Sequence, residues 1–228
     1  MGRLSALESK VSNGLVIVAM LAAGLIAGLA IVRFLPMLPD IRLPGQTAWY
    51  GARAAGMVAY LLATASVLFG MAIMTRMGGR VLGKANIADT HRSLSLLSLF
   101  AIAAHTAFLA LDSYANLGPV DLFVPFATWY RTFWTGLGII AAYLAIAVYV
   151  SFYLRSLIGY RAWRTFHYCA FAVFVLGTFH GLFAGSDAGT NWALAIYGTS
   201  AAAVLAMFAY RMSARKAAQP MRGVMPAQ

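Results

Sequence analysis

Six apolar runs, each about as long as a membrane is thick, constrain this chain more than any other feature. A bilayer core of about 30 Å requires roughly 20 apolar residues in a helix. The runs cover residues 14–35, 48–74, 92–112, 132–156, 165–184 and 191–210. Because 62% of the 228 residues are apolar and only 10% are charged, an ordinary soluble domain is excluded. We therefore predict an all-α integral membrane bundle of six transmembrane helices.

The first run follows Arg3 and Lys10, as the core of a signal peptide does, but its apolar stretch is too long for one. We interpret it as a retained helix. The chain then divides into an N-terminal helix with its outer loop (1–46), a helical core (47–210) and a basic cytoplasmic tail (211–228).

The basic residues predict which side of the membrane each loop occupies, because Lys and Arg gather in cytoplasmic loops. With a cytoplasmic N-terminus, all but four of the 17 Lys and Arg residues lie inside. The four outer ones are Arg33, Arg42, Arg53 and Arg131. We expect both termini in the cytoplasm and a multi-pass protein of the inner (plasma) membrane. The net charge of +11 then reflects topology, and the expected partner is membrane lipid and not nucleic acid.

All four histidines lie on two of the predicted helices. His91 and His105 are fourteen residues apart on one, and His167 and His180 are thirteen apart on the other. Both helices run from the inside to the outside, so His91 is level with His167, and His105 with His180. At 1.5 Å per residue the two levels are about 20 Å apart.

These histidines predict two haem sites. An ionisable residue inside a membrane marks a functional site by default, although a single histidine there is often a hydrogen-bonded core residue. Four histidines in two pairs of near-equal spacing favour a site. Neutral imidazole is a good iron ligand, and two facing imidazoles leave an iron six-coordinate, which suits electron transfer. We predict His91, His105, His167 and His180 as ligands of two haem b groups, with no catalytic side chain.

The spacing on the second of these helices does not fit an ideal α-helix. At 100° per residue, fourteen residues return within about 40° of the same face, whereas thirteen end about 140° away. We therefore expect helix 165–184 to be tilted or irregular, or His167 to lie at its very start. On the other histidine helix, Asp89 or Thr90 is expected to cap an N-terminus near His91.

Four arginines are candidates for binding the haem propionates. Arg92 and Arg164 lie at the inner level, beside His91 and His167, and Arg53 and Arg131 lie at the outer level. For Arg53, snorkelling from an apolar segment is the alternative explanation.

Two segments resemble a known family. They are DTHRSLSLLSLFAIAAHTAFLALDSY (89–114) and YRAWRTFHYCAFAVFVLGTFHGLFAGSD (160–187). They are similar to the ferric reductase-like transmembrane domain of eukaryotic ferric reductases, NADPH oxidases and a bacterial membrane subunit that serves a periplasmic methionine sulfoxide reductase. The likeness covers roughly 47–210 and places the four histidines on the family's b-type haem ligands. It implies transmembrane electron transfer by an oxidoreductase component.

The donor and the acceptor are expected on other molecules. No G-x-G-x-x-G element follows the last run, so we expect a separate cytoplasmic flavin reductase or reduced flavin as donor. Whether the chain itself binds FMN or FAD stays open. The acceptor at the outer face is a partner reductase, ferric iron or dioxygen. Two alternatives remain: a quinol-linked membrane cytochrome b, and a non-redox transporter or assembly factor whose histidines bind a metal ion or relay protons.

Overall fold

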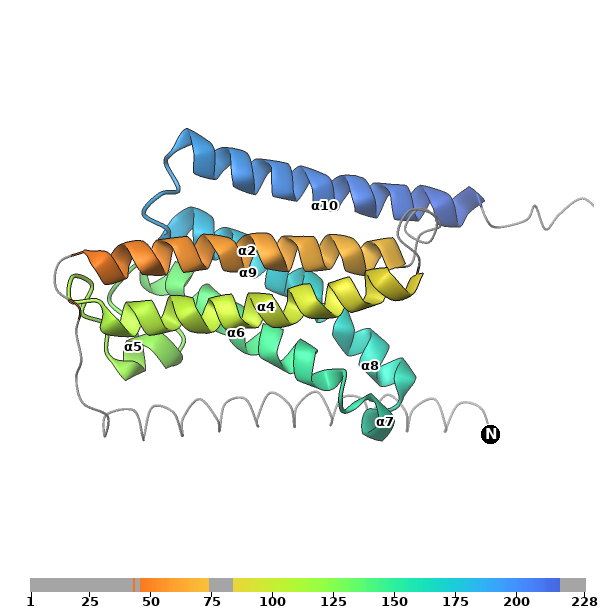
Figure 1. Cartoon of the computed structure of the whole chain (residues 1–228), viewed down its shortest axis with the longest axis horizontal. Helices are drawn as coiled ribbons and strands as arrows, with labels where there is room; N and C mark the ends of the chain where they lie inside the picture. The colour runs from red at the N-terminus through yellow and green to blue at the C-terminus, as the bar shows by residue number, and fades with distance from the viewer. Residues whose placement is uncertain (1–42, 44–45, 74–83, 218–228) are drawn as a thin grey trace, which may run out of the picture.

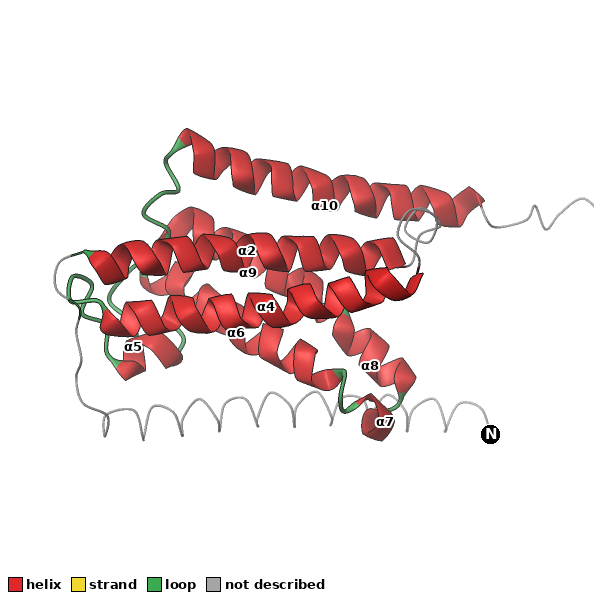
Figure 2. Cartoon of the chain, viewed as in Figure 1, coloured by secondary structure: helices red, strands yellow, loops and turns green. Residues whose placement is uncertain are grey.

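The computed structural model describes residues 43, 46–73 and 84–217, and this part of the chain is helical, without strands (Figures 1 and 2). One isolated bridge joins Leu43 to Asp112. The all-α prediction is thereby confirmed for the described residues. The predicted first span, 14–35, lies outside them.

Five stretches of helix are long and apolar enough to cross a membrane, as in a multi-pass membrane protein. They are α2 (Thr47–Ile73), α4 (Lys84–Leu111), α6 (Thr132–Ser151), α8 (Tyr160–His167) together with α9 (Cys169–Ala184), and α10 (Asn191–Ala217). Many of their large apolar side chains face outward, for example Phe100 and Leu205, which are 64% and 67% exposed. Such an outer surface suits contact with lipid.

Helices α2, α4, α6 and α9 form a four-helix arrangement, and α10 packs outside it (Figure 1). Helix α2 packs against α4 and α9, and α6 packs against the same two helices. Helices α4 and α9 therefore lie diagonally opposite each other, with α2 and α6 on the two sides. A hydrophobic cluster joins α2, α9 and α10 through Tyr60, Phe174 and Tyr197.

The bundle has two distinct ends. At one end, called the α5 end, α2, α6 and α10 begin, and the loop after α4 contains the short helix α5 (Pro119–Phe123). In this loop, Leu117 and Leu122 are buried beside Trp49 of α2. At the other end, called the α7 end, α6 is followed by the short helix α7 (Arg155–Ile158) and then by α8.

The predicted start of the first histidine helix is wrong. Helix α4 begins at Lys84, well before His91, so Asp89 and Thr90 are interior residues and not caps. The Thr90 hydroxyl donates to the carbonyl of Asn86, 2.7 Å away, inside the helix. Ile87 is buried, and its packing extends the helix beyond the apolar run that the sequence showed.

The second histidine helix is irregular, as predicted. Helix α8 ends at His167, and α9 begins after a turn at Tyr168. Around this turn the backbone bonds are of the tighter i to i+3 type, from Tyr168 N to Thr165 O (3.3 Å) and from Phe171 N to Tyr168 O (3.1 Å). A tighter turn rotates the chain by about 120° per residue. It therefore supplies part of the rotation that thirteen α-helical residues lack.

Candidate functional site

The four histidines form two facing pairs across the centre of the bundle. The ring centroids of His91 and His167 are 6.0 Å apart at an interplanar angle of 82°. Those of His105 and His180 are 6.2 Å apart at 83°. The structure thus pairs the residues that the helix directions placed level with one another.

Each pair joins α4 to the helical segment diagonally opposite it, which consists of α8 and α9. His91 and His105 lie on α4, where a spacing of fourteen keeps both on one face. His167 is the last residue of α8, and His180 lies on α9. The pair His91 and His167 is at the α7 end, and the other pair is toward the α5 end. The helical rise separates the two levels by about 21 Å.

Three of the imidazoles are held by backbone carbonyls of the flanking helices. Their Nδ1 atoms bond His91 to Ser66 O (2.8 Å), His105 to Ala52 O (2.7 Å) and His180 to Trp134 O (3.0 Å). A carbonyl only accepts, so each Nδ1 carries the hydrogen and donates it. In a neutral ring of this tautomer, the lone pair of Nε2 is free to bind a metal ion.

A glycine follows each of these carbonyls by four residues. The pairs are Ala52 with Gly56 and Ser66 with Gly70 on α2, and Trp134 with Gly138 on α6. In a helix, a side chain covers the turn that precedes its own Cα, so a glycine at position i+4 leaves the carbonyl of residue i open to an imidazole. A Cβ on Gly56 would lie 2.9 Å from His105 Nδ1, one on Gly70 would lie 3.1 Å from His91 Cε1, and one on Gly138 would overlap the His180 ring.

His167 differs from the other three histidines. Its Nδ1 is buried without a hydrogen-bond partner among the described residues. The indole nitrogen of Trp163, one turn earlier on α8, is buried and unpartnered in the same way. The two rings lie 5.2 Å apart between centroids, at an angle of 31°. Two adjacent buried ring nitrogens thus lack a hydrogen-bond partner among the described residues.

The dimensions of both pairs fit an iron ion between the rings. Two metal–nitrogen bonds of about 2 Å, with each ring centroid about 1 Å beyond its nitrogen, place the centroids about 6 Å apart. Within the described residues, no three His, Cys, Asp or Glu side chains gather into one group. Each level therefore offers two facing imidazoles, a pair of donors that can hold a haem iron.

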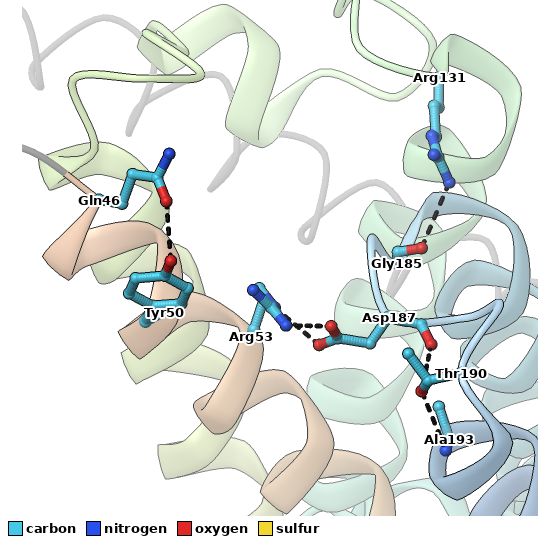
Figure 3. Close-up of polar contacts among 8 residues, drawn as sticks. All are labelled: Gln46, Tyr50, Arg53, Arg131, Gly185, Asp187, Thr190 and Ala193. Carbon is cyan, nitrogen blue, oxygen red and sulfur yellow. Dashed lines mark hydrogen bonds and ion pairs between the residues drawn. The ribbon is translucent and has the colours of Figure 1, made fainter.

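The two arginines predicted for the outer haem bind protein groups at the α5 end (Figure 3). Arg53 of α2 forms a two-pronged ion pair with Asp187 in the loop between α9 and α10, and its Nε lies 2.7 Å from Oδ2. Arg131 donates to the carbonyls of Phe183 (2.9 Å) and Gly185 (3.3 Å), where a cation is favoured by the C-terminal dipole of α9.

The two arginines predicted for the inner haem lie at the α7 end. Arg92 lies over the ring of Phe152, with its Cζ 5.1 Å from the centroid. Arg164 and Arg211 both lie against the hydroxyl of Tyr168. Each of the four arginines thus has a partner in the protein, and their role toward propionates stays a prediction.

The loop that holds Asp187 is itself well fixed. The Thr190 hydroxyl donates to the Asp187 carbonyl (2.7 Å), and the amide of Ala193 donates to Thr190 Oγ1 (3.4 Å), as at the N-cap of a helix (Figure 3). Arg53 therefore ties α2 to the start of α10 as well as to the end of α9.

Sequence reasoning missed Gly56, Gly70 and Gly138. One signal for two of them was present: Gly56 and Gly70 are fourteen residues apart, the same spacing as His91 and His105. Two antiparallel helices with matching fourteen-residue spacings can contact each other at two levels. Comparisons with protein-family models, with curated proteins and with solved structures find no match to this chain.

Proposed function

We propose that this protein transfers electrons across a membrane through two b-type haems, one held by His91 and His167 and the other by His105 and His180. The observation that carries the proposal is the pair of facing imidazoles at each of two levels, with centroids 6.0 and 6.2 Å apart. The proposal includes membership of the ferric reductase-like transmembrane family, which rests on the resemblance of residues 89–114 and 160–187.

Haem supplies one-electron chemistry, and the residues of this chain determine what that chemistry is used for. His91 with His167, and His105 with His180, would each hold one haem, and a haem held by two imidazoles would carry electrons in preference to binding dioxygen directly. The bonds from Nδ1 to Ser66, Ala52 and Trp134 fix the tautomer and the direction of three rings. Two such sites about 21 Å apart along the helices span most of a bilayer core.

The distribution of charge supports a direction for the transfer. Under the proposed topology the α7 end faces the cytoplasm and carries Arg92, Arg155, Arg161, Arg164 and Arg211. A basic face attracts an anionic donor, such as reduced flavin or an acidic flavin reductase. The α5 end then faces outward, toward the acceptor, and carries Asp112, Asp121 and Asp187.

The test is the haem content of the purified protein and its variants. We expect two haems per chain in a pyridine haemochrome assay and one after His105→Ala or His180→Ala. Thr106→Ala is the matched control, because Thr106 adjoins His105 and bonds only within its own helix, to Ile102. A wild-type protein without haem would overturn the proposal and favour the non-redox alternative, in which the histidines bind another metal ion or protons.

A further inference from the structure

The histidine pair at the α7 end contains one imidazole that the protein holds less firmly than the other three. His91, His105 and His180 each donate from Nδ1 to a backbone carbonyl. The Nδ1 of His167 has no partner among the described residues, although the atom is buried. Loss of such a supporting bond weakens metal binding by about 10- to 100-fold.

The sequence of α6 explains why His167 lacks this bond. Helix α2 repeats its carbonyl and glycine after fourteen residues, at 52 and 56 and again at 66 and 70. Helix α6 does not. Fourteen residues after Trp134 and Gly138 come Val148 and, just past the end of α6, Phe152. The Val148 carbonyl accepts instead from the Ser151 hydroxyl, 2.6 Å away, and α6 ends at Ser151.

The position of His167 in the chain also allows it to move. It is the last residue of α8, an eight-residue helix in which only Ala162 and Phe166 are buried. The turn at Tyr168 separates α8 from α9. At the other end of α8, Gly159 has a φ of 81°, and a Cβ there would have no neighbour within 4 Å. His167 thus lies on a short helix between two turns, whereas His180 lies within the longer helix α9.

We propose that His167 is a displaceable ligand, and that a small uncharged ligand of ferrous iron binds at the α7-end haem in its place. This inference rests on the proposed function. In the exchange, the bond from iron to His167 Nε2 breaks and a bond to the incoming ligand forms. The iron stays ferrous, and no electron or proton is transferred. The α5-end haem, whose two imidazoles are both supported by carbonyls, does not exchange.

Carbon monoxide tests this directly. The full-length protein, purified with its haems and reduced with dithionite, should bind one carbon monoxide for every two haems, measured by difference spectroscopy. No binding, or binding to both haems, would overturn the inference while two haems per chain would still support the proposed function. A haem-free protein would overturn both this inference and the proposed function.

A pair of cavity variants assigns the site. His167→Gly should keep the ratio of one carbon monoxide per chain and bind it faster, because no imidazole has to leave. His180→Gly should lose the α5-end haem, and its single remaining haem, at the α7 end, should bind one carbon monoxide. No binding by that remaining haem would place the exchangeable ligand at the α5 end. If His167→Gly loses its haem, the single remaining haem should bind no carbon monoxide, and binding by that haem would also overturn the inference.

A glycine variant tests whether the carbonyl bond controls the exchange. Gly138→Ala would push the His180 ring away from the Trp134 carbonyl, so every haem that the variant retains should bind carbon monoxide. Gly177→Ala is the control, because a Cβ at Gly177 has no neighbour within 4 Å, and its ratio should stay at one per two haems. An unchanged ratio in Gly138→Ala would show that the carbonyl bond does not hold the ligand.

Discussion

The two ends of the bundle support their histidine pairs in different ways. At the α5 end, both imidazoles bond to carbonyls, and Arg53 and Arg131 bind the last turn of α9 and the loop that follows it. At the α7 end, α6 stops early and α8 is separated from α9 by a turn. There Arg92 and Arg155 lie over the ring of Phe152, with Cζ atoms 5.1 and 4.0 Å from its centroid.

Two histidine pairs with nearly the same separation are therefore held with different firmness. The centroid separations of the two pairs differ by only a few tenths of an ångström. What differs is the number of groups that fix each ring. A ring held by a carbonyl has one tautomer and one direction, whereas a ring at a helix break has neither constraint.

The largest expected effect concerns which end faces the cell exterior, since labelling is all or none. In a background with Cys169→Ser, Val120→Cys on α5 should react with a membrane-impermeant thiol reagent in intact cells. Leu157→Cys on α7 should react only after the membrane is permeabilised. Both side chains are accessible in the fold, at 48% and 81% exposed. The reverse pattern would invert the proposed direction of electron transfer.

The next effect compares the glycines that contact the two ends of α4. Gly56→Ala places a Cβ 2.9 Å from His105 Nδ1, so the α5-end haem should bind about 10- to 100-fold more weakly. Gly70→Ala places a Cβ 3.1 Å from His91 Cε1, a contact that a small ring shift relieves, so its effect should be smaller. Haem transfer to an excess of a haem-scavenging protein measures both.

Gly198→Ala is the control for these substitutions, because a Cβ on Gly198 would have no neighbour within 4 Å. It should leave haem retention unchanged and raise the melting temperature slightly, since alanine is the better helix residue. An equal loss of haem in all three variants would show that the loss does not depend on contact between the new Cβ and an imidazole.

The positions of the histidines were predictable from sequence, and the way they are held was only partly so. Apolar length predicts the spans, and the direction of successive spans pairs His91 with His167 and His105 with His180. A spacing of thirteen also required an irregularity in the second helix. The carbonyls of Ala52 and Trp134 carry no side-chain signal, because any residue has a carbonyl, and only the glycine four positions later marks them.

At the start of α4, the sequence signal was present but misleading. Asp89 and Thr90 are good capping residues next to an apolar run, and the cap was predicted there. Helix propensity and the burial of Ile87 instead carry the helix back to Lys84. Local capping preferences of about 1 kcal/mol are weaker than tertiary packing of this kind.

A smaller effect is expected for the ion pair that closes the α5 end. Arg53→Ala and Asp187→Ala should each lower the melting temperature, and a double-mutant cycle should give a coupling of about 1–2 kcal/mol. We place it no higher because the Arg53 side chain is 32% exposed, which screens the charges. A coupling near zero would mean that the pair does not tie α2 to the loop after α9.

The same variants test whether Arg53 binds only Asp187 or a haem propionate as well. Removing the arginine should lower the midpoint potential of the α5-end haem, and removing the aspartate should raise it, because a nearby positive charge favours the reduced form. The double variant should return to the wild-type potential if Arg53 serves Asp187 alone. A potential that stays low in the double variant would indicate that Arg53 also binds a haem propionate.

The smallest effect is expected for Trp163, and its sign tests the α7 end. The indole N–H is buried without an acceptor among the described residues, and a buried unsatisfied donor costs about 1–3 kcal/mol. Trp163→Phe removes this donor and keeps an aromatic ring against His167. The stability gained by removing the unsatisfied donor is offset by lost apolar contact, so we expect the melting temperature to be unchanged or slightly raised.

Trp49→Phe at the α5 end, where the ring packs edge-on against Tyr114 and Tyr130, should lower the melting temperature instead. A clear loss of stability in Trp163→Phe would mean that the indole has an acceptor in the membrane, such as a lipid carbonyl or a water molecule, and that the α7 end is as firmly held as the α5 end.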